Sequence, residues 1–197
     1  MYIYSIMGYG KAKTESGLGM IVRAIANNHK VLLAQFLKDG NSSEFLYLKD
    51  KIDCMASGTK GILLPKNKTE EDINDINLFY KEVFNQINNK EYDLVVLDEI
   101  LVALDMGIIS YAMLKLLIQT CRDKDIDMYM TGRVRDRHTR EYVTDISDCV
   151  TDAYCIKHPF DTYCEKCKNS FPYYYTYCPD CGSELTPSRP CKEGRDF

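Results

Sequence analysis

A glycine- and lysine-rich turn near the N-terminus has the residue types that bind phosphate. It follows a short β-branched and aromatic run, precedes a helical pattern, and reads Gly8-Tyr9-Gly10-Lys11-Ala12-Lys13-Thr14. In such a turn the backbone N–H groups at a helix N-terminus converge on an anion, and a lysine adds positive charge. Thr14 stands where the hydroxyl of a phosphate loop binds Mg²⁺. The alternative is a glycine turn that simply begins a basic helix, since Met7 and Ala12 stand where phosphate loops usually have glycine.

Two further polar groups also follow apolar strand patterns. Asp98-Glu99 comes directly after Leu94–Leu97, and one of the two carboxylates can hold Mg²⁺ directly or through water. Thr131-Gly132-Arg133 follows Met128–Met130, and an arginine there can pair with a phosphate through two hydrogen bonds. With the glycine turn, these groups predict a nucleoside triphosphate site. The alternatives are a solvated strand end and, for the arginines at 133, 135, 137 and 140 with His138, a solvated basic face that touches RNA.

Four cysteines near the C-terminus have the spacing of a zinc site, Cys164-x2-Cys167-x10-Cys178-x2-Cys181. Two CxxC turns place four thiolates around one tetrahedral Zn²⁺, and with all four positions filled the zinc is expected to be structural. A disulfide is disfavoured because Met1–Met7 does not resemble a secretory signal. The other five cysteines are expected to be inert, with Cys149 and Cys155 buried as small apolar residues: Cys54, Cys121, Cys149, Cys155, Cys191.

The elements that position these groups follow from apolar periodicity. Strands are predicted at 2–6, 31–36, 94–97, 128–130 and 149–156. Helices are predicted at 13–26, from Thr69 to about Ile87, from Ser110 to about Cys121, and at 141–146. Residues 38–68 are expected to be rich in loops. Alternating strands and helices predict an α/β fold with a mainly parallel sheet and helices on both faces, in which ligands bind beyond the carboxyl ends of the strands.

Length and composition restrict the protein's class. The 197 residues allow a domain at 1–157 and a cysteine-containing tail at 158–197, which has too few aliphatic residues to fold without metal. The net charge of −4 disfavours general nucleic-acid binding. No apolar run approaches the roughly 18 residues of a membrane span. We therefore expect a cytoplasmic protein without membrane or nucleic-acid partners.

The blocks of residues together resemble a known family, the P-loop ATP:cob(I)alamin (corrinoid) adenosyltransferases. The turn at 8–14 resembles that family's phosphate loop, usually G-N-G-K-G-K-T-T. The other blocks follow in family order over roughly residues 2–160: Gly19–Ala26, Gln35–Lys38, Asp93–Glu99, Thr131–Arg133 and Lys157-His158-Pro159-Phe160. The resemblance implies a RecA-like P-loop fold.

The resemblance also implies an activity. The cobalt of a reduced cob(I) corrinoid would attack the 5′ carbon of ATP, giving an adenosylated corrinoid and inorganic triphosphate. Lys13 and the amides of the loop at 8–15 would bind the phosphates, with Lys11 and Arg133 assisting. Thr14 and Glu99 would hold Mg²⁺, and Asp98 would contact these ligands without binding the metal directly. A homodimer and a corrinoid-reducing flavoprotein partner are further expectations of the family.

Three departures from the family pattern concern the site. Ala12 adds a Cβ where the backbone approaches phosphate, which weakens binding if this residue needs a positive φ. Glu15 replaces a threonine and brings a negative charge. The segment Ala56–Lys60 lacks the aromatic pair that some members use to displace the corrinoid's lower ligand. The zinc tail is an addition that the resemblance does not explain.

Two other functions compete with this interpretation. A zinc-bearing nucleoside kinase of the thymidine kinase type also combines a phosphate loop with paired CxxC motifs, but it releases ADP rather than triphosphate. In a non-catalytic protein, the altered loop would bind nucleotide without turnover, and the zinc tail would recruit a partner.

Overall fold

The chain divides into two compact units in the computed structural model, Met1–Tyr154 and Cys155–Phe197. The structure describes residues 1–58, 68–154, 162–171, 175–178 and 180–187. Within these ranges, no helix is both long and apolar enough to cross a lipid bilayer. The predicted block Lys157–Phe160, the positions Thr59 and Lys60, and the cysteines Cys155 and Cys191 lie outside the described residues.

The first unit is built on a six-stranded sheet in the order β3-β2-β4-β5-β1-β6. Every neighbouring pair is parallel. The strands are β1 (Ile3–Gly8), β2 (Val31–Gln35), β3 (Asp53–Ala56), β4 (Leu94–Asp98), β5 (Asp127–Gly132) and β6 (Cys149–Ala153). Because all strands run the same way, their carboxyl ends lie along one edge of the sheet.

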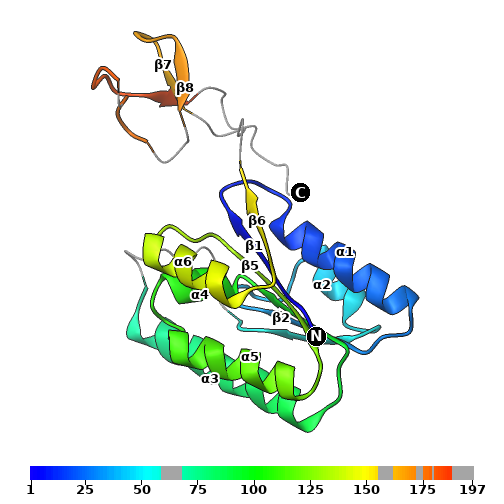
Figure 1. Ribbon diagram of the computed structural model, residues 1–197. Coiled ribbons are helices and arrows are strands. Elements are labelled where there is room, and N and C mark those ends of the chain that lie inside the picture. The colour runs from blue at the N-terminus through cyan, green and yellow to red at the C-terminus, as the bar shows by residue number, and fades with distance from the viewer. Residues whose placement is uncertain (59–67, 155–161, 172–174, 179, 188–197) are drawn as a thin grey trace. The chain divides into compact units, whose positions relative to one another are not determined.

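Helices cover both faces of this sheet (Figure 1), which confirms the predicted fold class. One layer holds α1 (Lys13–Ala26) and α2 (Ser43–Leu48). The other holds α3 (Glu70–Asn89), α4 (Ile100–Asp105), α5 (Tyr111–Asp123) and α6 (Arg137–Ile146). Each layer buries an apolar stripe against the sheet, and the central strand β4 is buried along its whole length.

Capping residues set several helix starts as the sequence predicted. Thr69 accepts a hydrogen bond from the backbone of Asp72, whose carboxylate accepts one in return, so a capping box begins α3. Ser110 caps α5 by accepting from the backbone N–H of Met113. Helix α1 has the predicted bounds.

Short elements were predicted less well. The region 38–68, expected to be loop-rich, contains α2 and β3, and α4 was not predicted. Helix α6 starts at Arg137 rather than Glu141, because Asp136 caps it by accepting from the N–H of Thr139. The prediction that Cys149 is buried was wrong. It is exposed because β6 is an edge strand.

The second unit contains a small antiparallel sheet in the order β8-β7-β9. Its strands are β7 (Thr162–Cys164), β8 (Asn169–Phe171) and β9 (Thr186–Pro187). The buried apolar residues that the structure describes here are only Cys164, Cys178 and Leu185. So small a core does not stabilise a fold by itself, and small domains of this kind are usually stabilised by a bound metal ion.

The packing of α3 generates a stability prediction. Ile76 is fully buried against the sheet, whereas Leu78 on the same helix is 56% exposed. We expect Ile76→Ala to lower the free energy of unfolding of the first unit by about 2–5 kcal/mol, because it removes buried methyl groups and leaves a cavity. Leu78→Ala is the matched control and should change it by less than about 0.5 kcal/mol. Urea denaturation measures both; equal losses would contradict this packing.

Candidate functional site

The buried carboxylate of Asp98 connects four segments at the carboxyl edge of the sheet. Its Oδ1 accepts hydrogen bonds from Thr14 Oγ1 at 3.0 Å and Thr131 Oγ1 at 2.6 Å. Its Oδ2 accepts from Lys38 Nζ at 2.7 Å and Gln35 Nε2 at 3.1 Å. Asp98 is only 1% exposed. A carboxylate so deeply buried requires such donors, because an unpaired buried charge is costly.

The glycines of the predicted phosphate loop lie against the end of β6. Gly8 has a φ of +113°, and a Cβ added there would be 2.3 Å from Asp152 Oδ1 and 2.5 Å from the carbonyl oxygen of Ala153. Gly10 donates its N–H to that same carbonyl at 2.7 Å. Side chains larger than hydrogen are therefore excluded at Gly8, and the bend is fixed by backbone contacts.

The second half of the loop leads into α1. Ala12, just before the helix, has a φ of +76°, so the condition under which its Cβ is unfavourable is met. This conformation costs alanine about 1–2 kcal/mol. Lys13 Nζ donates to the carbonyl oxygen of Gly10 at 2.6 Å, and burial lowers the pKa of Lys13 below its usual range. Lys11 and Glu15 are exposed.

Glu99 and Arg133 contribute charge beside Lys13. Glu99 is half-buried with a φ of +61°, and its N–H donates to Thr131 Oγ1 at 3.0 Å. Burial raises the pKa of Glu99, with the charge of Asp98 adding to the effect, whereas the charges of Lys38, Lys13 and Arg133 oppose it. The guanidinium of Arg133 lies 5.3 Å from the ring centroid of Tyr9.

The structure thus gathers the loop, the acidic pair and the Thr131–Arg133 segment at one edge. The carboxylate that contacts Thr14 is that of Asp98. Gln35 and Lys38 received no role from the sequence, although polar residues at the end of a buried strand and shortly after it were a usable signal. Two of the arginines beyond 133 form ion pairs, Arg137 with Glu141 and Arg140 with Asp152.

The oxygen atoms of this edge suit a hard divalent cation. Carboxylate, hydroxyl and amide oxygens are the ligands that Mg²⁺ and the water molecules around it prefer. Thr14 gives its proton to Asp98, which leaves oxygen lone pairs available. The buried Oε1 of Gln35 has no hydrogen-bond partner within the described part of the chain. Such an acceptor suits a metal-bound water.

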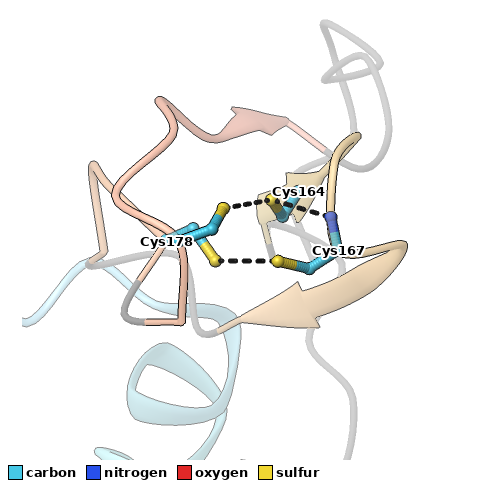
Figure 2. Close-up of side chains that lie close together, drawn as sticks. Cys164, Cys167 and Cys178 are labelled. Atoms are coloured by element: carbon cyan, nitrogen blue, oxygen red, sulfur yellow. Dashed lines mark hydrogen bonds between the residues drawn. The ribbon is translucent and has the colours of Figure 1, made fainter.

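The four predicted zinc ligands form one cluster in the second unit. The Sγ atoms of Cys164, Cys167, Cys178 and Cys181 all lie within 4.8 Å of one another. Figure 2 shows three of these side chains converging. The Sγ–Sγ distances are 3.6 Å for Cys164 and Cys181 and 3.8 Å for Cys167 and Cys178. A tetrahedron with Zn–S bonds of about 2.3 Å has edges of about 3.8 Å, so the cluster fits zinc.

Two similar turns build this cluster. Each CxxC is followed by a residue with positive φ, Lys168 at 55° and Gly182 at 70°. The N–H of each donates at 2.8 Å to the carbonyl of the first cysteine of its turn. Both turns therefore aim two sulfur atoms inward by the same backbone geometry.

Comparison with known proteins finds a family model and relatives that match most of the chain. A family model described as ATP:corrinoid adenosyltransferase BtuR/CobO/CobP matches residues 1–168. A corrinoid adenosyltransferase from Sinorhizobium sp is 26% identical over 157 residues, covering 78% of this chain and 72% of the relative. One from Pseudomonas aeruginosa is 27% identical over 157 residues, covering 78% and 74%. An uncharacterised Nostoc sp. protein, all2391, is 27% identical over 173 residues but is covered over only 43% of its length.

The contacts of Thr131 generate a prediction about the site. Thr131→Val removes the donor to Asp98 Oδ1 and the acceptor for the Glu99 N–H. Because both groups would stay buried without that partner, we expect the free energy of unfolding to fall by about 2–4 kcal/mol. Thr131→Ser keeps the hydroxyl and should cost only about 1 kcal/mol for the lost methyl. Chemical denaturation compares the two; a serine variant as unstable as the valine variant would show that the methyl, not the network, matters.

Proposed function

The chain belongs to the ATP:corrinoid adenosyltransferase family, and we propose that it acts through the loop at residues 8–15, the Asp98–Glu99 pair and Arg133. The family's reaction transfers the 5′-deoxyadenosyl group of ATP to the cobalt of a reduced corrinoid. Cobalt(I) attacks the 5′ carbon, the bond from that carbon to oxygen breaks, and inorganic triphosphate leaves. The observation that carries the site assignment is the convergence of these segments on Asp98.

The main electrostatic task of the protein is to stabilise the negative charge of the leaving triphosphate. We propose that the loop amides at the start of α1 and Lys13 bind the phosphates, with Lys11 and Arg133 assisting. Lys13 is supported by its position beside the Gly10 carbonyl, and Arg133 by its contact with Tyr9. Preorganised cations and N–H donors stabilise developing negative charge more strongly than water does.

Magnesium is the proposed partner of the polyphosphate. Thr14 and Glu99 would hold it, and Asp98 would orient the Thr14 hydroxyl by accepting its proton. The metal would neutralise charge on the phosphate oxygens. The half-buried position of Glu99 beside Lys13 supports this assignment.

The protein need not supply a nucleophile, since the substrate's cobalt is one. In agreement, burial raises the pKa of Cys121 to about 12 and that of Cys54 to about 11, so both thiols stay protonated at neutral pH. The Ala56–Lys60 segment without aromatic residues implies that corrinoid docking differs from members with the aromatic pair.

Further proposals concern organisation and partners. We propose a boundary near residue 157 between the adenosyltransferase domain and the cysteine tail, with structural Zn²⁺ in the tail. A cytoplasmic location, a homodimer and a corrinoid-reducing flavoprotein partner are proposed from the family.

The activity is tested anaerobically with chemically reduced cobalamin, ATP and Mg²⁺. We expect the spectrum of the adenosylated corrinoid and release of triphosphate; release of ADP would indicate a kinase instead. Lys13→Ala should lower the rate at least about 100-fold, because it removes a cation from the leaving group. Lys115, exposed on α5, provides the matched control Lys115→Ala, which should keep the wild-type rate. Full activity of Lys13→Ala would refute its assigned role.

The zinc proposal predicts about one Zn²⁺ per purified chain by mass spectrometry of the metal. Cys178→Ser should lose that zinc, because three thiolates bind it far more weakly. Cys149→Ser, which replaces an exposed cysteine outside the cluster, should retain it. Zinc retained by both variants, or absent from the wild type, would contradict the assignment.

A further inference from the structure

The side chain of Lys38 lies between the two groups on which the proposed metal site depends. Its Nζ is 2.7 Å from Asp98 Oδ2 and 3.3 Å from Thr14 Oγ1. Lys38 follows Leu37, whose positive φ of 59° turns the chain at the end of β2. One ammonium thus bridges the hydroxyl of the phosphate loop and the central carboxylate.

The hydrogen bonds of Thr14 show what this bridge does. The hydroxyl has one proton, which it donates to Asp98 Oδ1. Its oxygen then has lone pairs to offer, and Lys38 Nζ donates to one of them. A metal ion bound to Thr14 also uses an Oγ1 lone pair. The ammonium therefore contacts the same oxygen that a divalent cation would need.

Charge makes simultaneous occupation unfavourable. An ammonium and a divalent cation both touching Thr14 Oγ1 would lie only a few ångströms apart, where like charges in a partly buried site repel strongly. The two residues differ in freedom, since the side chain of Asp98 alone is 2% exposed and that of Lys38 is 29% exposed. The backbone around Lys38 is held, because its carbonyl accepts from the N–H of Gly58 at 3.0 Å. The flexible lysine stem is the part that can move away.

We propose that Lys38 is the resident counter-ion of Asp98, which the divalent cation accompanying ATP must displace from Thr14 and Asp98. This inference rests on the proposed phosphate loop and metal site and adds a residue that tunes them. Lys38 is a positioning residue. Its ammonium holds the Thr14 hydroxyl and the Asp98 carboxylate in position and sets the metal concentration at which nucleotide binds.

The experiment measures ATP binding to the full-length chain by calorimetry, without corrinoid, at a series of free Mg²⁺ concentrations. Lys38→Met keeps the stem but removes the competing charge. We expect the free Mg²⁺ concentration that gives half-maximal ATP binding to fall about tenfold. Lys38→Gln, which keeps a donor for Asp98, should show the same direction and serves if the methionine variant does not fold. Lys38→Arg keeps the charge and should not lower the midpoint.

Each outcome bears on a stated claim. A midpoint that changes less than twofold in both neutral variants, or that rises, overturns the displacement by Lys38 while leaving Mg²⁺-dependent binding by the wild type intact. A wild type that binds ATP without any dependence on Mg²⁺ overturns the metal site and this inference together. Lys115→Met is the matched control and should leave the midpoint unchanged.

Discussion

The first unit depends on a single negative charge placed where its strands end. The carboxylate of Asp98 is almost inaccessible to water and collects four hydrogen bonds from residues that are distant in sequence. Breaking a buried pairing of this kind leaves an uncompensated charge, which costs several kcal/mol. The arrangement is therefore expensive to disturb in any one of its parts. The same donors that compensate the charge also fix the start of α1 relative to β2 and β5.

Backbone geometry imposes the second constraint on this edge. Four residues at the carboxyl ends of β1, β2 and β4 have a positive φ: Gly8, Ala12, Leu37 and Glu99. Such residues persist only when the surrounding packing determines their conformation, and they occur often at functional sites. The strain here is held by the parallel sheet, which presents the strand ends at fixed spacing. The backbone positions of these strand-end residues are thus set by the sheet.

The sequence predicted the features that depend on local periodicity and spacing. The alternation of strands and long helices, the caps at Thr69 and Ser110, and the convergence of the CxxC turns follow from such local rules. What it missed depends on tertiary contacts. The short helix α4 is held by burial against β5 rather than by its own signals. The burial of Cys149 was misjudged because an edge position is a property of the sheet order, which the strand's own residues do not encode. The contact of Lys38 with Asp98 could be predicted only by knowing that β2 and β4 are neighbours.

The attachment of the turn at residues 8–14 to β6 has a consequence for local opening of the first unit. The N–H of Gly10 donates a hydrogen bond to the carbonyl of Ala153, in β6, which is the edge strand of the described sheet and is largely exposed. Edge segments fray at much lower free energy than the global unfolding of a domain, as amide hydrogen exchange shows in many proteins. Local opening of β6 will therefore loosen the bend at residues 8–14, while β4 at the centre of the sheet keeps its hydrogen bonds. A ligand bound in that bend would in turn slow amide hydrogen exchange along β6. The turn after β1 and the strand β6, from opposite ends of the first unit's sequence, would then open and close together.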